Sequence, residues 1–327
     1  MLISAPLAAM AVGAGFGAQA LLRPDPRDSA LLEALIARPQ TVTTAAAPLR
    51  SQSASPAGPP AEDALPASLQ AQRAQEPSSG ADGLAVPQDG PEVPLEIRVA
   101  LLKLSTQPAL SASGPWRLFD RQGRTLRSGS AGERIPYGAE LASADEVWLE
   151  TTAAAHLSAD GRTYEGRFRL LRGEGGVRVV NHLSLETYVS SVVGGEMPTH
   201  WAAEALRAQA VAARSYAMAH MARPAGAHWH LGDTTRWQNY EGLSSVTRST
   251  RQATASTAGI ILSYQGGIVE SLYAATQQIV DEAHGHLGAS MSQTGAQDMA
   301  SQGLRYNQIL GRYYQGASLA RLQAGAR

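Results

Sequence analysis

Short runs in which apolar and polar residues alternate begin at Leu95. A period of two residues is typical of strands that bury one face, and segments rich in Gly, Asp and Ser separate the runs as turns would. The pattern predicts a small antiparallel β-rich region over 95–183. Its strands are expected at 96–104, 116–120, 146–150, 163–171 and 177–183.

The hydrophobic period changes after residue 183. Ser184 can cap a helix that carries Glu186 in its first turn, and Gly194 and Gly195 stand where such a helix would end. A longer alanine-rich helix is predicted over 200–222, with Pro224 and Gly226 ending it. Extended segments and short helices should follow at 259–264, 268–276, 292–303 and 304–314. We therefore predict an α+β fold whose helical core spans 184–320.

The first 94 residues differ from this folded part. Residues 1–37 contain an apolar run of small residues that is typical of a signal peptide or N-terminal membrane anchor, although no Lys or Arg precedes the run. An ordinary buried helix is the alternative. Residues 38–94 are rich in Pro, Ala, Ser and Gln and are expected to be a disordered linker, or a tail without a role. Both membrane interpretations place the rest of the chain outside the cytoplasm, in the periplasm, the cell envelope or the medium.

The composition of the chain excludes several kinds of functional site. The chain has a formal net charge of -1 and no cysteine, which excludes disulfides, thiolate metal sites and a cysteine nucleophile. Positive charge is carried by arginine except at Lys103, which we interpret as compositional bias. Because no polybasic stripe is present, we expect no nucleic-acid partner.

One carboxylate stands out in the stretch GGEMP, residues 194–198. Pro198 forbids a continuous helix, so Glu196 should lie on a stiff corner between two helices, close to the positive end of the second one. Glu196 could be a functional acid. It could also do no more than cap the following helix.

Three motifs follow one another within 177–319: LSLETYVSSVVGGEMPTHWAAEALRAQAVAARSYAMAH, DTTRWQNYEG and MSQTGAQDMASQGLRYNQILGRYYQGASL. They resemble the motifs of the SpoIID/LytB family, which comprises stage II sporulation protein D and the amidase enhancers. The resemblance implies an exported, sporulation-related or cell-wall protein. It also implies a glycan-binding cleft in the helical core.

The resemblance assigns a role to Glu196. Catalytic members of the family are lytic transglycosylases that cut peptidoglycan glycan strands stripped of their peptides, and the glutamate of their EMP motif is the acid/base. Ordinary glycosidases need two carboxyl groups. A lytic transglycosylase needs one, because the C6 hydroxyl of the sugar attacks the anomeric carbon. Burial near Met197 and Trp201 could raise the pKa of Glu196 so that it is protonated near neutral pH.

The resemblance suggests further substrate-binding positions, and each has a structural alternative. Arg214 and Tyr216 could bind sugar groups, or the arginine could pair with Glu204 and the tyrosine could lie in the core. Gln238 and Tyr240 belong to a motif whose Asp233 and Thr234 are also turn formers. Ser292 and Gln293 suit hydrogen bonds to sugars, although Ser292 could instead cap a helix.

The chain departs from the family in two places. Family members that bind zinc use Cys and His near the second motif, and here only His228 and His230 lie nearby, so we expect no metal and no cofactor. A short connection, 274–290, also replaces a longer family segment after Tyr273. His286 is only an approximate counterpart of the motif histidine. Part of one cleft wall should therefore be missing.

Two functions remain open. The first is a lytic transglycosylase that cleaves peptide-stripped glycan strands with Glu196 as its single acid/base. The second is a non-catalytic amidase enhancer that holds glycan or a cell-wall amidase. A degenerate remnant with structural value alone is a third possibility.

Overall fold

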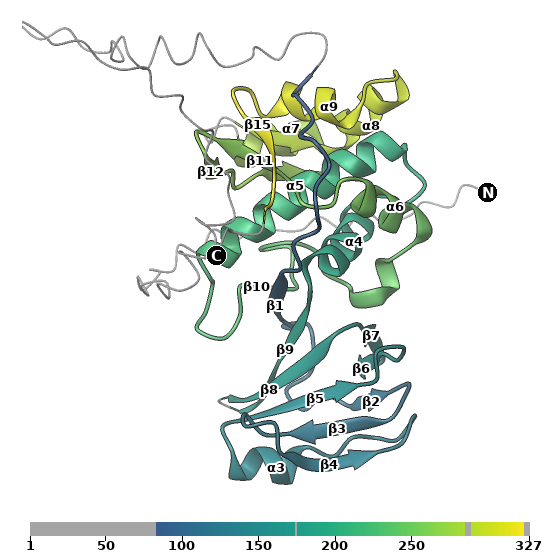
Figure 1. Ribbon diagram of the computed structural model, residues 1–327, viewed down its shortest axis with the longest axis vertical. Helices are drawn as coiled ribbons and strands as arrows, with labels where there is room; N and C mark the ends of the chain where they lie inside the picture. Colours follow the sequence, from purple (N-terminus) through teal and green to yellow (C-terminus); the bar gives the residue numbers. More distant parts are fainter. Residues whose placement is uncertain (1–82, 174, 285–288, 324–327) are drawn as a thin grey trace, which may run out of the picture.

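A computed structural model describes residues 83–173, 175–284 and 289–323, and the leader and most of the expected linker lie outside these residues. The first part of the described chain is rich in strands (Figure 1). These elements are β1 (Glu96–Ala100), β2 (Leu110–Ala112), β3 (Trp116–Phe119), β4 (Thr125–Gly129), α3 (Gly138–Ser143), β5 (Glu146–Thr151), β6 (Leu157–Ala159), β7 (Arg162–Tyr164), β8 (Arg167–Gly173) and β9 (Gly176–Ser184).

The second part is mainly helical and lies above the strands in Figure 1. Its elements are α4 (Leu185–Glu196), α5 (Ala203–Ala222), β10 (Leu231–Gly232), the 3-10 helix η1 (Gly242–Ser245), α6 (Arg248–Ser256), β11 (Ile260–Tyr264), β12 (Gly267–Ile268), β13 (Leu272–Ala274), α7 (Gln277–Ile279), the π-helical turn η2 (Val280–His284), β14 (Ser290–Ser292), α8 (Gln293–Ser301), α9 (Tyr306–Tyr313) and β15 (Ser318–Arg321). The predicted α+β class is confirmed.

One seven-stranded sheet links the two parts, with the strand order β10-β1-β9-β8-β5-β3-β4. Neighbouring strands are antiparallel except β10, which runs parallel to β1. Residues of alternate positions, such as Leu118, Leu149 and Phe168, are fully buried and share a core with the small sheet β2-β6-β7. Because β9 continues directly into α4, the sheet fixes where the first core helix begins.

The expected linker ends earlier than predicted. Residues 83–94 run along the helical part: Leu84 is buried against Ile309 and Leu310 and exchanges hydrogen bonds with Asn307. Asp89 forms an ion pair with Arg321 at 2.9 Å. The composition of 38–94 hid this single buried leucine, so the boundary at residue 94 is wrong. Within the described residues, no helix is both long enough and apolar enough to span a bilayer.

The start of α4 matches the prediction, and its end does not. The Ser184 side chain caps the helix by accepting a hydrogen bond from the Thr187 N–H at 3.1 Å. The helix then continues through Gly194 and Gly195 to Glu196, and Met197 adopts the extended backbone expected before a proline. Neither glycine has a positive φ.

Close packing explains the glycine pair. A Cβ atom at Gly194 would overlap the carbonyl oxygen of Ser245, and one at Gly195 would overlap that of Asn239. The pair therefore lets the loop 233–245 press its backbone against the last turn of α4. The prediction that these glycines cap the helix is wrong. They are required because a side chain would collide with the backbone of the loop 233–245, and not because their own backbone angles need glycine.

We expect Gly195→Ala to lower the free energy of unfolding by about 1–3 kcal/mol, because backbone must move to admit the methyl group. Gly138→Ala is the matched control: Gly138 also lies in a helix and a Cβ there meets open space. The control should be neutral or slightly stabilising. Chemical denaturation of both variants measures the difference, and equal stabilities would contradict the packing argument.

Candidate functional site

Glu196 is the last residue of α4 and is partly exposed, whereas the following Met197 is buried. Its Oε1 accepts a hydrogen bond from the backbone N–H of Asn239 at 2.7 Å. In the first turn region of α5, the Ala202 N–H donates instead to Gln297 at 2.9 Å. Glu196 thus does not cap the following helix, and that alternative interpretation is wrong.

Asn239 joins three groups at this corner. Besides its backbone contact to Glu196, its side-chain Nδ2 donates to the carbonyl of Gly195 at 2.8 Å. Its Oδ1 accepts from the Nζ of Lys103 at 2.7 Å, and Nζ also donates to Glu241 at 2.7 Å. Asn239 therefore holds the carboxyl group of Glu196 in a fixed position and connects it to the positively charged Lys103.

Lys103 reaches the site because of the loop that follows β10. The buried Asp233 in this loop accepts a hydrogen bond from the Leu102 N–H at 2.8 Å, and its own N–H donates to Ala100. Burial raises the pKa of Asp233. The aspartate ties its loop to the end of β1, which supports the structural interpretation of this motif residue.

The third motif supplies Gln293, the first residue of α8. Its side chain is buried, and its interaction with the Glu196 carboxyl group lowers the pKa of that group. The parallel pairing of β13 and β14 places Tyr273 opposite Met291 and Ala274 opposite Ser292. The short connection 274–290 thus joins two neighbouring strands and still delivers the third motif to the acid.

Burial raises the pKa of the Glu196 carboxyl group above its usual value. Three contacts oppose this rise: the Asn239 N–H, the Gln293 side chain and the charge of Lys103, all of which favour the ionised form. The loss of hydration exceeds them. A carboxyl group with a raised pKa remains protonated at higher pH than an ordinary glutamic acid, as a proton donor must.

Tyrosines surround the acid. The charge of Glu196 contributes to raising the pKa values of Tyr188, Tyr216 and Tyr273, after the larger effect of their own burial. Gln238 connects two of these rings, since its Oε1 accepts from the Tyr188 hydroxyl and its Nε2 donates to the Tyr273 hydroxyl, both at 2.8 Å. Gln238 is itself buried, so it supports the site from behind.

Three predicted binding residues lie elsewhere. Arg214 is fully buried in a two-pronged ion pair with Glu186, at 2.8 and 2.6 Å, and not with Glu204. Tyr240 is a core residue whose hydroxyl donates to Asn181 at 2.7 Å. Ser292 caps α8 by accepting from the Gly295 N–H at 3.1 Å. All three side chains thus make structural contacts; the predicted Ser292 cap is confirmed, whereas the predicted Glu204 partner of Arg214 is wrong.

Of the predicted residues, the structure thus brings Glu196, Tyr216 and Gln293 together, with Gln238 behind them. Lys103, Asn239 and Tyr273 were missed. The isolation of Lys103 as the single lysine was a signal, and we had interpreted it as compositional bias. Asn239 sits inside the second motif, but nothing in the sequence distinguishes its backbone N–H from any other.

The two neighbouring histidines do not form a metal site. Both ring nitrogens of His230 lie against N–H groups of Arg98, at 3.1 and 2.9 Å, and burial lowers its pKa to about 3. Among the described residues, no group of three or more His, Asp or Glu side chains is arranged to hold a metal ion.

Comparisons with known proteins match part of the chain. Residues 173–264 match the model of the family SpoIID, described as Stage II sporulation protein. An uncharacterized protein of Brachyspira hyodysenteriae is 36% identical over 117 residues, which cover 36% of this chain and 32% of the relative. The amidase enhancer of Bacillus subtilis is 32% identical over 102 residues, covering 31% and 14%. Stage II sporulation protein D of Bacillus amyloliquefaciens is 31% identical over 112 residues, covering 30% and 33%. The chain thus matches about a third or less of the length of each of these three relatives.

The raised pKa of Glu196 predicts how stability depends on pH. Between the ordinary value near 4.5 in the unfolded chain and the higher folded value, the folded state binds more protons, so this group loses stabilising effect as pH rises. Glu196→Gln is neutral throughout. Its melting temperature relative to the parent should therefore rise as the pH increases above about 4.5. The exposed Asp298→Asn on α8 serves as the control. A difference that does not vary with pH would contradict the shift.

We expect Arg214 to contribute to the stability of the folded protein. Arg214→Met leaves Glu186 without its partner and should lower the free energy of unfolding by about 3–5 kcal/mol. The double variant Arg214→Met with Glu186→Leu removes both charges and should recover much of this loss. Thermal and chemical denaturation of the two variants measures the effect. A single variant of parental stability would instead favour a ligand-binding role for Arg214.

Proposed function

The chain belongs, by residues 173–264, to the SpoIID family, and on this premise we propose that it is a cell-wall lytic transglycosylase. Its substrate is the peptidoglycan glycan strand from which the peptides have been removed. The observation that carries the proposal is one partly exposed carboxyl group, Glu196, whose pKa is raised by burial and whose position is fixed by the backbone N–H of Asn239.

The proposed reaction uses this group twice. Glu196 first protonates the oxygen of the glycosidic bond, so that the bond breaks and positive charge develops at the anomeric carbon. The carboxylate then accepts the proton of the C6 hydroxyl of the same muramic acid residue, and the hydroxyl oxygen attacks the anomeric carbon. The product is a 1,6-anhydro ring and a shortened strand. No water and no second carboxyl group enter the reaction.

The surrounding residues suit this sequence. A raised pKa supplies the proton at the start, while Lys103, Asn239 and Gln293 stabilise the carboxylate that forms midway. Tyr273, on β13, is partly exposed and offers aromatic surface and a hydroxyl group near the acid for a sugar ring, whereas Tyr216, on α5, is buried. We extend the substrate-binding proposal to Tyr273 and withdraw it from Arg214, Tyr216, Tyr240 and Ser292.

A second function is an amidase enhancer that binds glycan or a cell-wall amidase without cleaving it. The similarity to the amidase enhancer of Bacillus subtilis supports this alternative. Either function requires export to the envelope, which the apolar segment in 1–37 would provide as a signal or anchor. The two functions differ in one measurable product, the anhydro end.

We expect Glu196→Gln to reduce cleavage of peptide-free glycan strands by a factor of about 10² to 10⁴, with little change in glycan binding. Mass spectrometry of the digest measures the 1,6-anhydro ends. For the parent, kcat/KM should fall as pH rises through the raised pKa of Glu196, because the free protein must begin protonated. Asp298→Asn should leave both results unchanged.

Two outcomes would contradict the proposal. A Glu196→Gln variant that cleaves as fast as the parent would remove Glu196 from the reaction. A parent that binds glycan and yields no anhydro ends would favour the amidase enhancer.

A further inference from the structure

The outward face of the seven-stranded sheet carries an unusual set of side chains. Strand pairing places Phe119 on β3 opposite Trp148 on β5, and Trp148 opposite Arg169 on β8. Because successive side chains point to opposite faces, these residues lie away from the buried Leu149 and its neighbours. A tryptophan, a phenylalanine and an arginine thus form one row across three adjacent strands.

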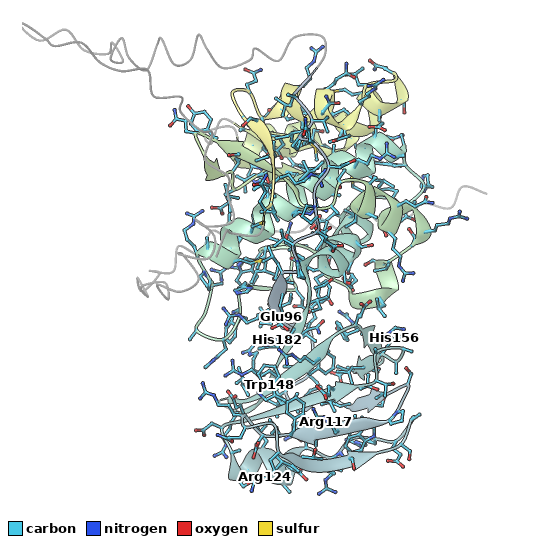
Figure 2. All side chains as sticks on the ribbon, in the orientation of Figure 1. Glu96, Arg117, Arg124, Trp148, His156 and His182 are labelled. Atoms are coloured by element: carbon cyan, nitrogen blue, oxygen red, sulfur yellow. The ribbon has the colours of Figure 1, made fainter. Side chains whose placement is uncertain are left out.

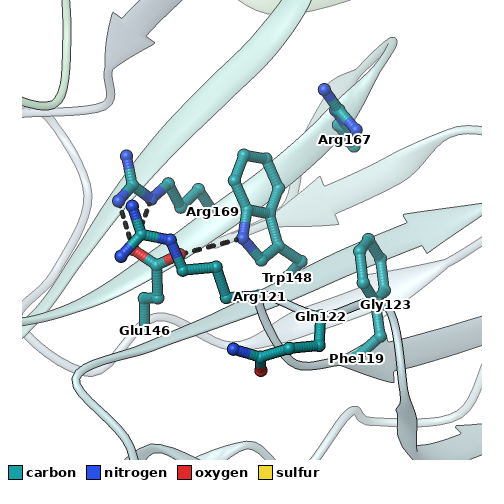
Figure 3. A pocket seen from close by; sticks show the side chains of 8 residues that line it. All are labelled: Phe119, Arg121, Gln122, Gly123, Glu146, Trp148, Arg167 and Arg169. Atoms are coloured by element: carbon teal, nitrogen blue, oxygen red, sulfur yellow. Dashed lines mark hydrogen bonds and ion pairs between the residues drawn. The ribbon is translucent and has the colours of Figure 1, made fainter.

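This row borders a hollow, seen in Figure 3. The turn after β3 forms one edge, and Trp148 lies between two arginines from β8. The residues that line the hollow are Phe119, Arg121, Gln122, Gly123, Glu146, Trp148, Arg167 and Arg169. None of them belongs to the Glu196 site.

The arginines are held against the aromatic rings. The guanidinium carbons of Arg167 and Arg169 lie 4.8 and 5.5 Å from the Trp148 ring centre, and that of Arg117 lies 4.6 Å from Phe119. A guanidinium group stacked by its face keeps N–H groups in its plane free to point outward. Stacking therefore reduces the freedom of these side chains while leaving donors for an anion.

Ion pairs between neighbouring strands do not neutralise the charge of this sheet face. Arg169 pairs with Glu146, and Arg117 pairs with Glu150 at 2.5 Å. Positive charge nevertheless exceeds negative charge on the face. The cations are Arg98, Arg117, Arg121, Arg167, Arg169 and Arg178, against the anions Glu96, Glu146 and Glu150.

Two arginines at the hollow are the most available. The Arg121 side chain is 77% exposed and lies 3.9 Å from Glu146, a loose pair. Arg167 is 42% exposed and pairs with Glu96, which is itself open to solvent. Exposed pairs of this kind contribute little to stability, so an incoming anion can compete for the arginines at low cost.

Two strands of the sheet lead to the elements that carry the Glu196 site. β1 leads to Lys103 and β9 leads into α4, which ends at Glu196. Figure 2 shows Trp148 and Arg117 on the sheet, with His182 and Glu96 between them and the helical part.

We propose that this sheet face binds a carboxylate-bearing glycan strand, as an accessory site for the strand that Glu196 cleaves. The inference rests on the proposed function. Removing a peptide from muramic acid leaves a free carboxylate on its lactyl ether, so a stripped strand repeats sugar rings and anions. Rings can pack on Trp148, which is only partly buried, and carboxylates can pair with Arg121 and Arg167. Contact at two sites would raise the affinity for long strands.

The test measures binding of the full chain carrying Glu196→Gln, which prevents cleavage. The test variant adds Arg121→Gln and Arg167→Gln. The control adds Arg251→Gln and Arg312→Gln, which remove the same charge from exposed positions on α6 and α9. The probes are peptide-stripped glycan strands, neutral chitin oligosaccharides of the same length, and a single-stranded oligonucleotide.

We expect the test variant to bind stripped strands about tenfold to a hundredfold more weakly than the control, as for loss of charge-assisted hydrogen bonds. The loss should shrink for neutral chitin. Added salt should weaken binding of the parent more than that of the test variant.

Three results would overturn the accessory site: equal binding by test and control variants, an equal loss for neutral chitin, or tighter sheet-dependent binding of the oligonucleotide than of the glycan. A cleavage assay of the chain with Glu196 intact tests the proposed function separately. A protein that forms anhydro ends at the parental rate after both sheet arginines are replaced, and still binds long strands as the control does, would keep its function and lose this site.

Discussion

The helical part of the protein depends on one buried ion pair. Arg214 on α5 has no exposed surface, and its guanidinium group contacts Glu186 on α4 by two hydrogen bonds and the carbonyl of Ile260 on β11 at 3.1 Å. A buried charge is tolerated only when its donors are used, so α4, α5 and β11 must meet in one arrangement. Glu186 begins α4 and Glu196 ends it. The ion pair therefore fixes the helix whose other end carries the candidate acid.

The position of that acid follows from a second constraint, the close approach between α4 and the loop 233–245. Gly194 and Gly195 leave room for the loop backbone, and Asn239 then bonds both Gly195 and Glu196. The contact removes water from the carboxyl group and supplies one N–H in return. Burial outweighs this compensation and the charge of Lys103, so the pKa rises. Packing and acidity are thus two results of the same contact.

The sequence predicted features that depend on neighbours in the chain. The Ser184 cap, the break at Pro198 and the α+β class need only local patterns. The predictions were wrong where a residue far away in the sequence determines the structure. Arg214 was predicted to bind substrate, and nothing near it in the sequence indicates Glu186 as its partner. Gly194 and Gly195 were predicted to cap α4, because the loop that packs against them lies over 40 positions away in the sequence. Helix α6 was missed because its polar sequence has few apolar residues at helical spacing.

The shortened connection shows how the site can persist when a segment is lost. The missing residues suggested a missing cleft wall, yet β13 and β14 pair directly, with Tyr273 beside Met291. Parallel strands need a crossover connection of about a dozen residues or more, and the segment 275–289, which includes α7 and η2, is long enough to provide it. α8 begins directly after β14 with Gln293, whose side chain lowers the pKa of Glu196. The residue that reaches the acid from this region therefore depends on the strand pairing, whereas the length of the connecting segment can vary.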